Sequence, residues 1–262
     1  MNLGGSKILA DQCKLAKVKS LVYTSSSAVF GIPKMNPVTE KTVPSPAESY
    51  GKAKYEAENI FADLKKSGIN VSIIRPRTIL GTGRLGIFQI LFEWIYQGKN
   101  IPVLGRGENL YQFVHASDLA SACILAGEER SNENYNIGAK VFHSMRETLE
   151  GLIKHSKSNS RVVGINKKLA KFGMDFSATI GISPLGAYHS LMYGESMYFD
   201  IAKAEKDLGF SPKYSNIEMF IKSYDWYVEN RTGILSGEIS GSGHQSKLRQ
   251  GVLSMIPSVL VW

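Results

Sequence analysis

Short apolar runs alternate with longer amphipathic segments along the first half of the chain. Apolar runs typical of buried strands lie at 20–25 and 70–75, and a further strand is predicted at 135–138. Residues 6–18 and 49–66 have the composition of helices, the second being rich in Lys, Glu and Ala. Strands that alternate with helices predict an α/β fold with a parallel sheet and crossover helices.

The pattern continues less regularly downstream. An apolar helix is predicted at 87–96, and a short strand at 112–115 precedes a helix that runs through Ala126. Ser117 and Asp118 are predicted to cap that helix. Beyond 140 the pattern indicates only short helices.

Composition is typical of a soluble globular protein. The chain has 262 residues, of which 43% are hydrophobic and 21% are charged. A chain of this length and composition can form one or two domains, each with a buried hydrophobic core. No run of 18 uncharged apolar residues and no signal-peptide pattern occurs, so we expect no membrane span. Cys13 and Cys123 fit neither a disulfide framework nor a metal site, and the five histidines form no recognisable cluster. We therefore expect a cytoplasmic protein without a bound metal.

The net charge of +8 is concentrated in one segment. Between residues 151 and 174 six basic residues occur without an acid: Lys154, Lys157, Arg161, Lys167, Lys168 and Lys171. A solvated basic face is the simplest interpretation, and a surface that attracts nucleotide diphosphates or anionic lipid headgroups is the alternative. Because aromatic residues are not interleaved with these cations, nucleic-acid binding is not expected.

The candidate chemistry lies in a Tyr-Lys pair. Tyr50 and Lys54 are four residues apart in the predicted helix, so their side chains share one face. The phenol of a tyrosine has a pKa of about 10, and an adjacent ammonium lowers that pKa and makes proton exchange with a substrate hydroxyl feasible. The run Ser25-Ser26-Ser27 could hold the same oxygen. A Tyr and a Lys at this spacing usually lie on a solvated helix face. The neighbouring serine run is what favours a catalytic interpretation.

Six stretches together carry a family resemblance, namely YTSSSAVFG, SYGKAKYEAE, IIRPRTILGTG, YQFVHASDLA, YNIG and FDIAKAEKDLGFSPKY. In order and spacing they resemble the extended short-chain dehydrogenase/reductase family, in its NAD-dependent epimerase/dehydratase branch of nucleotide-sugar epimerase-like proteins. The resemblance implies a Rossmann-like parallel sheet with flanking helices, a smaller C-terminal substrate-binding lobe, NAD or NADP as cofactor and a small-molecule substrate.

The resemblance also assigns roles to single residues. Ser26 matches the catalytic Ser/Thr, with Ser25 or Ser27 as the alternative. Tyr50 matches the acid/base, and Lys54 matches its partner, which also holds the nicotinamide ribose.

Three positions near the next strand match binding residues of the family. Pro76 lies where the family contacts the nicotinamide. Arg77 and Thr78 occupy the place of a substrate-phosphate ligand that is usually Asn.

Two departures from the family pattern narrow the predicted reaction. Where sugar dehydratases carry an Asp-Glu pair, this chain has Ser27, assigned to substrate binding, and Ala28, so dehydration is not expected. Tyr111 stands where many epimerases place an arginine on the substrate diphosphate. The loss of a charge-assisted contact worth about 1.5–3 kcal/mol weakens the case for a nucleotide-diphosphate substrate.

The family pattern has a glycine-rich GxxGxxG turn between an opening strand and a helix, where the pyrophosphate rests. This sequence contains no such turn, and residues 2–9 instead resemble the helix shortly before the serine strand. We therefore expect an N-terminally truncated sheet that binds its cofactor weakly. The sheet would keep an unpaired edge, which favours a homodimer.

The predicted domains follow from the resemblance. Residues 1–140 form a partial Rossmann-like NAD(P)-binding domain with interleaved substrate-lobe segments at about 81–110, and 141–232 form mainly the substrate-binding lobe. Residues 233–262 comprise a Gly/Ser-rich linker and an apolar tail, which is too short to span a bilayer but suited to peripheral contact.

Three functions stay open from sequence. The first is an NAD(P)-dependent epimerase or reductase of a sugar or other secondary alcohol, with a Ser/Tyr/Lys site. The second is a cofactor-free fragment or pseudoenzyme that serves as a binding module. The third is a hydroxysteroid-dehydrogenase-like oxidoreductase on an apolar alcohol.

Overall fold

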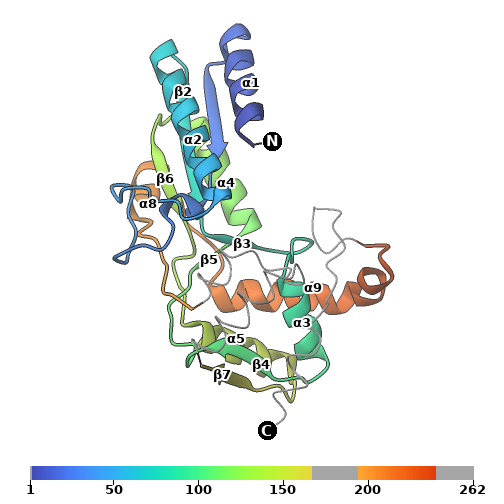
Figure 1. The fold of residues 1–262 in the computed structure, drawn as a ribbon. Helices are drawn as coiled ribbons and strands as arrows, with labels where there is room; N and C mark the ends of the chain where they lie inside the picture. The colour runs from blue at the N-terminus through green and yellow to red at the C-terminus, as the bar shows by residue number, and fades with distance from the viewer. Residues whose placement is uncertain (1, 167–193, 240–262) are drawn as a thin grey trace. The chain divides into compact units, whose positions relative to one another are not determined.

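A computed structural model describes residues 2–166 and 194–239, which belong to two compact units (Figure 1). Unit 1 comprises Met1–Ile79, Gln112–Lys140 and Met197–Lys213, and unit 2 comprises Leu80–Tyr111, Val141–Ser196 and Tyr214–Trp262. Unit 1 contains most of the predicted site residues and is described first.

The core of unit 1 is a three-stranded parallel sheet in the order β1-β2-β6. Its strands are β1 (Ser20–Thr24), β2 (Asn70–Pro76) and β6 (Asn134–Ile137), and the register pairs Thr24 with Ile74 and Pro76 with Ile137. The three predicted strands and their parallel pairing are thus confirmed. The central strand β2 is buried from its second residue onward, as expected for a strand whose two faces are both covered by helices.

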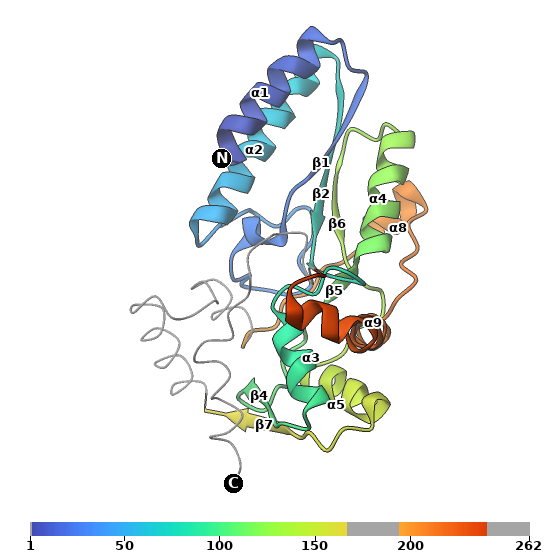
Figure 2. The same ribbon diagram turned by 90° about the vertical axis from the view of Figure 1, so that its right-hand side faces the viewer.

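Helices cover both faces of this sheet (Figure 2). On one face lie α1 (Asn2–Leu15) and α2 (Ser49–Leu64), and on the other lies α4 (Ala116–Glu128). The helix α1 begins four residues earlier and ends three residues earlier than the predicted helix 6–18.

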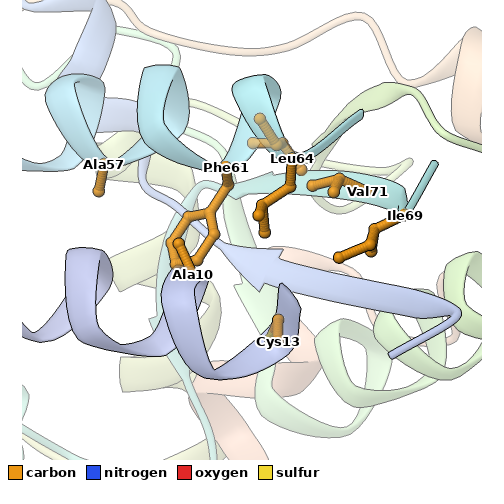
Figure 3. Packing of buried hydrophobic residues seen from close by; sticks show 8 residues of the cluster. Ala10, Cys13, Ala57, Phe61, Leu64, Ile69 and Val71 are labelled. Carbon is orange, nitrogen blue, oxygen red and sulfur yellow. The ribbon is translucent and has the colours of Figure 1, made fainter. Parts of the chain in front are cut away.

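The two helices α1 and α2 meet over a compact hydrophobic cluster (Figure 3). The helix α1 contributes the small side chains of Ala10 and Cys13, which let the helices approach closely. The rest of the cluster comes from α2, from β2 and from the residue just before β2: Ala57, Phe61, Leu64, Ile69, Val71 and Ile73. The short helix η2 (Lys65–Ser67) links α2 to this strand.

The two edges of the sheet differ. At β6, the backbone N–H of Asn136 donates to the Glu40 carboxylate at 2.8 Å, and α8 (Ala202–Leu208) packs nearby. At the other edge, β1 pairs with β2 alone among the described residues, and its side chains stay partly exposed. The open edge expected from the sequence is therefore at β1.

A second, two-stranded sheet joins β3 (Thr78–Leu80) to β5 (Phe113–His115). The prediction that Ser117 and Asp118 cap the following helix is wrong, because the ring Nδ1 of His115 accepts the Ser117 N–H at 3.3 Å and caps α4. The Asp118 side chain is buried and accepts a hydrogen bond from the backbone N–H of Lys213 at 3.1 Å.

The described part of unit 2 contains three helices, α3 (Phe88–Tyr96), α5 (Met145–Ser156) and α9 (Asn216–Ser236), and a parallel pair of strands, β4 (Ile101–Leu104) and β7 (Val162–Ile165). The two strands were not predicted from the sequence. The helix α5 begins with a capping box, in which the side chains of Ser144 and Glu147 bond to each other's backbone N–H.

The last described helix corrects the predicted start of the linker. The helix α9 continues through the first four residues of the predicted linker, 233–236, and ends at Gly237 in a left-handed conformation. The apolar tail and Lys167, Lys168 and Lys171 of the basic segment lie outside the described residues. In the part of the chain that is described, no helix is long and apolar enough to cross a membrane.

Candidate active site

The Tyr-Lys helix begins at the carboxyl end of β1. The Glu48 carboxylate caps α2 by accepting the N–H groups of Tyr50 and Gly51 at 2.7 and 2.6 Å. One turn later, the Lys54 Nζ donates to the backbone carbonyl of Thr24 at 3.0 Å. Because Thr24 is the last residue of β1, this bond ties the YxxxK motif to the strand end that leads into the serine run.

The Lys54 ammonium lies near two tyrosine rings. Its Nζ is 5.0 Å from the ring centroid of Tyr23 and 5.9 Å from that of Tyr50. Burial lowers the pKa of Lys54, and the negative charge of Glu58 opposes this effect. Lys54 therefore loses its proton at a lower pH than an exposed lysine does. It lies beside Tyr50, its partner in the predicted acid/base pair.

Of the two tyrosines, only one suits proton exchange. Burial, followed by the negative charge of Glu58, raises the pKa of Tyr23 to about 12, so its phenol stays protonated at neutral pH. The Tyr50 side chain is 45% exposed and can be reached by a substrate. Accessibility therefore favours Tyr50, the residue predicted from the sequence, over Tyr23.

The three candidate serines differ in exposure. Ser25 and Ser27 are buried, whereas Ser26 is half-buried and caps the short helix η1 (Ser27–Phe30) by accepting the Ala28 N–H at 3.2 Å. Ser26 is thus the most accessible hydroxyl of the three. The distance between the hydroxyls of Ser26 and Tyr50 stays a prediction.

The residues after β2 occupy buried positions. Pro76 ends the strand and is buried, while Thr78 on β3 is half-buried. Arg77 is only 2% exposed, and its Nη1 donates to the Ser27 Oγ at 3.0 Å and contacts the Met197 Sδ at 3.2 Å. These contacts are internal to unit 1, and the role of Arg77 on a substrate phosphate stays a prediction.

Tyr111 belongs to unit 2, whereas the other predicted site residues belong to unit 1. Its side chain is buried, and its backbone carbonyl accepts the side-chain amide of Asn216 at 2.7 Å. The predicted contact of Tyr111 with a substrate is not tested by these bonds.

Gly51 is a site residue that the sequence analysis missed. A Cβ on Gly51 would lie 2.4 Å from the backbone oxygen of Ala28, closer than real Cβ contacts come. The absence of a side chain therefore lets the first turn of α2 pack directly on η1, beside Ser26. The sequence did contain a signal for this role, namely a glycine within a predicted helix. Such a glycine lowers helix stability and is usually retained because of close packing.

We expect Gly51→Ala to separate these two segments. The added methyl meets backbone rather than a flexible side chain, so the free energy of unfolding should fall by about 1–3 kcal/mol. Urea unfolding followed by far-ultraviolet circular dichroism measures the loss. The matched control is Gly5→Ala on α1, where nothing lies within 4 Å and the substitution should be neutral or stabilising. Equal effects of both substitutions would contradict the packing role.

The cofactor contacts expected from the family concern both ends of a nicotinamide dinucleotide. At the nicotinamide end, the roles of Lys54, Tyr50 and Pro76 stay predictions. Gly4 and Gly5 lie within α1 rather than in a turn between a strand and a helix, so they do not form a pyrophosphate cradle. No cluster of His, Cys, Asp or Glu in the described segments could hold a metal ion.

Comparisons with known proteins identify the family of this chain. The profile of the NAD dependent epimerase/dehydratase family matches residues 1–138, more than half of the chain. The chain belongs to this family. The match includes the serine run, the Tyr-Lys helix and all three strands of the parallel sheet.

Two curated relatives illustrate the range of similarity. "Uncharacterized protein y4nG" of Sinorhizobium fredii (strain NBRC 101917 / NGR234) is 49% identical over 261 residues, covering 99% of this chain, and the chain spans 65% of that relative's length. The UDP-glucose 4-epimerase of Lactobacillus helveticus is 28% identical over 256 residues, covering 88% of this chain and 71% of the enzyme.

A solved structure supports the fold. The UDP-glucuronic acid 4-epimerase from Bacillus cereus, in complex with NAD, superposes with a TM-score of 0.70 at 23% identity, covering 87% of this chain and 67% of that chain. The Rossmann-like α/β architecture expected from the sequence is thus confirmed.

Proposed function

We propose that this epimerase/dehydratase family member acts on a secondary alcohol of a sugar, as an NAD(P)-dependent epimerase or reductase. The observation that carries the proposal is the bond from Lys54 to the Thr24 carbonyl, which anchors the Tyr-Lys helix at the strand end before the serines. The similar proteins named as UDP-glucose and UDP-glucuronic acid 4-epimerases favour a sugar over an apolar alcohol.

In the proposed reaction the chain's own residues handle the proton and the substrate oxygen. Tyr50 exchanges a proton with the reacting hydroxyl, and the Lys54 ammonium stabilises the phenolate form of Tyr50. The Ser26 hydroxyl orients the same oxygen. Bound NAD would accept and return the hydride.

Dehydration is not part of the proposal. The step requires one group to remove a proton and another to protonate the leaving hydroxyl. The positions that would supply them hold Ser27, whose hydroxyl accepts a hydrogen bond from Arg77, and Ala28, whose methyl has no proton to exchange. Epimerisation and simple reduction need neither group.

We expect residues 1–262 by themselves to bind NAD or NADP weakly and to show no measurable turnover. Lys54 can reach a ribose, but it cannot replace the several backbone N–H groups and helix dipole of a glycine-rich turn. Titration calorimetry tests the affinity, and joining a strand–GxxGxxG–helix segment in cis should restore both binding and turnover. A micromolar affinity of residues 1–262 would show that the chain holds its cofactor by another route.

We also propose that the chain forms a homodimer through the open edge at β1. The Ser25 N–H donates to the Ile74 carbonyl at 2.7 Å. Since alternate amides of a strand point to opposite sides, the Val22 amide faces outward.

Sedimentation equilibrium should show association that Val22→Pro weakens, because proline removes this donor. Val141→Lys, at an exposed apolar residue of unit 2, is the control and should leave association unchanged. A monomeric wild type would contradict the proposal.

A further inference from the structure

A buried ion pair involves Glu58, which lies one helical turn after the candidate active-site lysine. The Arg75 guanidinium donates to both oxygens of Glu58, from Nε at 2.9 Å and from Nη2 at 2.7 Å. Arg75 is 4% exposed and Glu58 is 3% exposed, so both charges are removed from water. Removing one partner from such a pair strands the other charge in the interior, which makes the arrangement sensitive to substitution.

Both partners are held by elements that also shape the site. Glu58 lies on α2 one turn after Lys54, so the two side chains share a helix face. Arg75 lies on β2, one residue before Pro76, and its guanidinium carbon is 5.1 Å from the ring centroid of Phe30, the last residue of η1. The pair therefore connects the Tyr-Lys helix, the central strand and the serine turn.

We propose that Glu58 is a positioning residue for Lys54, with Arg75 fixing the Glu58 carboxylate in the orientation that this role requires. The proposal rests on the proposed function, since it explains how the predicted catalytic lysine is kept charged and aimed. Glu58 supplies the negative charge that favours the ammonium, against the burial that disfavours it.

In the described segments, the other neighbours of the Lys54 ammonium are two aromatic rings and a carbonyl. The ammonium faces the rings of Tyr23 and Tyr50 and the carbonyl of Thr24. Burial lowers the pKa of Lys54 and Glu58 is the influence that raises it. Loss of the Glu58 charge should therefore leave burial and the Arg75 cation acting together against the ammonium.

The pKa of Lys54 can be measured without cofactor or turnover. Reductive methylation of the 262-residue chain with ¹³C-formaldehyde labels the lysines, and the Lys54 signal is the one lost in Lys54→Arg. Glu58→Gln should lower the pKa of Lys54 by about one pH unit, a tenfold change in proton affinity. It should also weaken the nuclear Overhauser contacts between the Lys54 methyls and the Tyr23 ring.

Two further variants separate this role from a merely structural one. Glu93→Gln removes the same charge from a buried arginine pair in unit 2 and should leave the pKa of Lys54 unchanged. Glu58→Asp keeps the carboxylate and should retain most of the wild-type pKa. If Glu58→Gln does not fold, the double variant Glu58→Gln/Arg75→Met replaces the pair with neutral side chains. In this variant the pKa of Lys54 should fall by less than the one unit expected for Glu58→Gln.

An unchanged pKa of Lys54 in folded Glu58→Gln, or in the double variant where Glu58→Gln does not fold, would overturn the proposal. An equal fall in Glu93→Gln would do so as well, because it would show a general effect of destabilisation. The proposed function has a separate test, since a rate that survives the loss of the Tyr50 hydroxyl would refute the catalytic assignment while leaving the measured effect of Glu58 intact.

Discussion

Tyr50→Phe is expected to lower the rate of sugar oxidation by about 10²–10⁴-fold, the usual contribution of general acid–base catalysis. The substitution keeps the ring that lies 5.9 Å from the Lys54 Nζ and removes only the hydroxyl. The chain should therefore fold normally and lose the group that exchanges a proton with the substrate. The measurement is single-turnover reduction of NAD, in residues 1–262 joined in cis to a strand–GxxGxxG–helix segment.

The control for this prediction is Tyr55→Phe. Tyr55 lies five residues further along the same helix, so it points away from the Tyr-Lys face, and its substitution should leave the rate within about twofold of the wild type. A loss of less than tenfold in Tyr50→Phe would contradict its role as the acid/base. Equal losses in both variants would indicate damage to α2 rather than to the chemistry.

The parallel sheet was predictable because its strands carry strong local signals. The strand β2 contains the β-branched residues Val71, Ile73 and Ile74 and ends at Pro76, and six of its seven residues are buried. The strands β4 and β7 lacked such signals, since β4 contains Pro102 and β7 contains Gly164, both of which disfavour strands. A Cβ on Gly164 would lie 2.3 Å from the Gly105 oxygen, so a tertiary contact requires the glycine that conceals the strand.

The site was predictable to the extent that it is local in sequence. The spacing of Tyr50 and Lys54 places both on one helix face, and in the structure the Lys54 ammonium lies at the carboxyl end of β1. The Glu58–Arg75 pair was not predictable, because a glutamate in a Lys/Glu-rich helix usually faces solvent. Its burial depends on a partner 17 residues away on a strand, and no local pattern specifies that contact.

A second cluster of buried charge stabilises unit 2. The Glu93 carboxylate on α3 is 3% exposed and accepts hydrogen bonds from Arg231 on α9, at 2.8 Å from Nε and 2.6 Å from Nη2. The Tyr227 hydroxyl and the Gln97 amide also donate to it. Burial alone raises the pKa of Glu93, but the hydrogen bonds from Arg231, Tyr227 and Gln97 outweigh it, so the pKa lies below its ordinary value.

Arg231→Met should therefore destabilise unit 2 strongly. The variant keeps the length of the side chain and leaves the Glu93 carboxylate buried without its cation, which costs about 3–5 kcal/mol. Because Arg231 is 28% exposed, we expect a value near the lower end of that range. All three tryptophans belong to unit 2, so urea unfolding followed by tryptophan fluorescence reports on this unit.

The dependence on pH identifies the cause of this loss. A carboxylate whose pKa is depressed on folding contributes stability that is present above its unfolded pKa and disappears as the pH falls through its folded pKa. The difference in free energy of unfolding between wild type and Arg231→Met should therefore be largest at neutral pH. It should decrease as the pH falls below 4.5, the ordinary pKa of Glu93. Lys66→Met, which breaks the exposed pair with Asp63, is the control and should change stability little at any pH. A difference in free energy of unfolding that stays unchanged in acid would contradict this cause. It would mean that Arg231 stabilises α9 by packing its guanidinium carbon 4.4 Å from the Tyr96 ring centroid, rather than by neutralising Glu93.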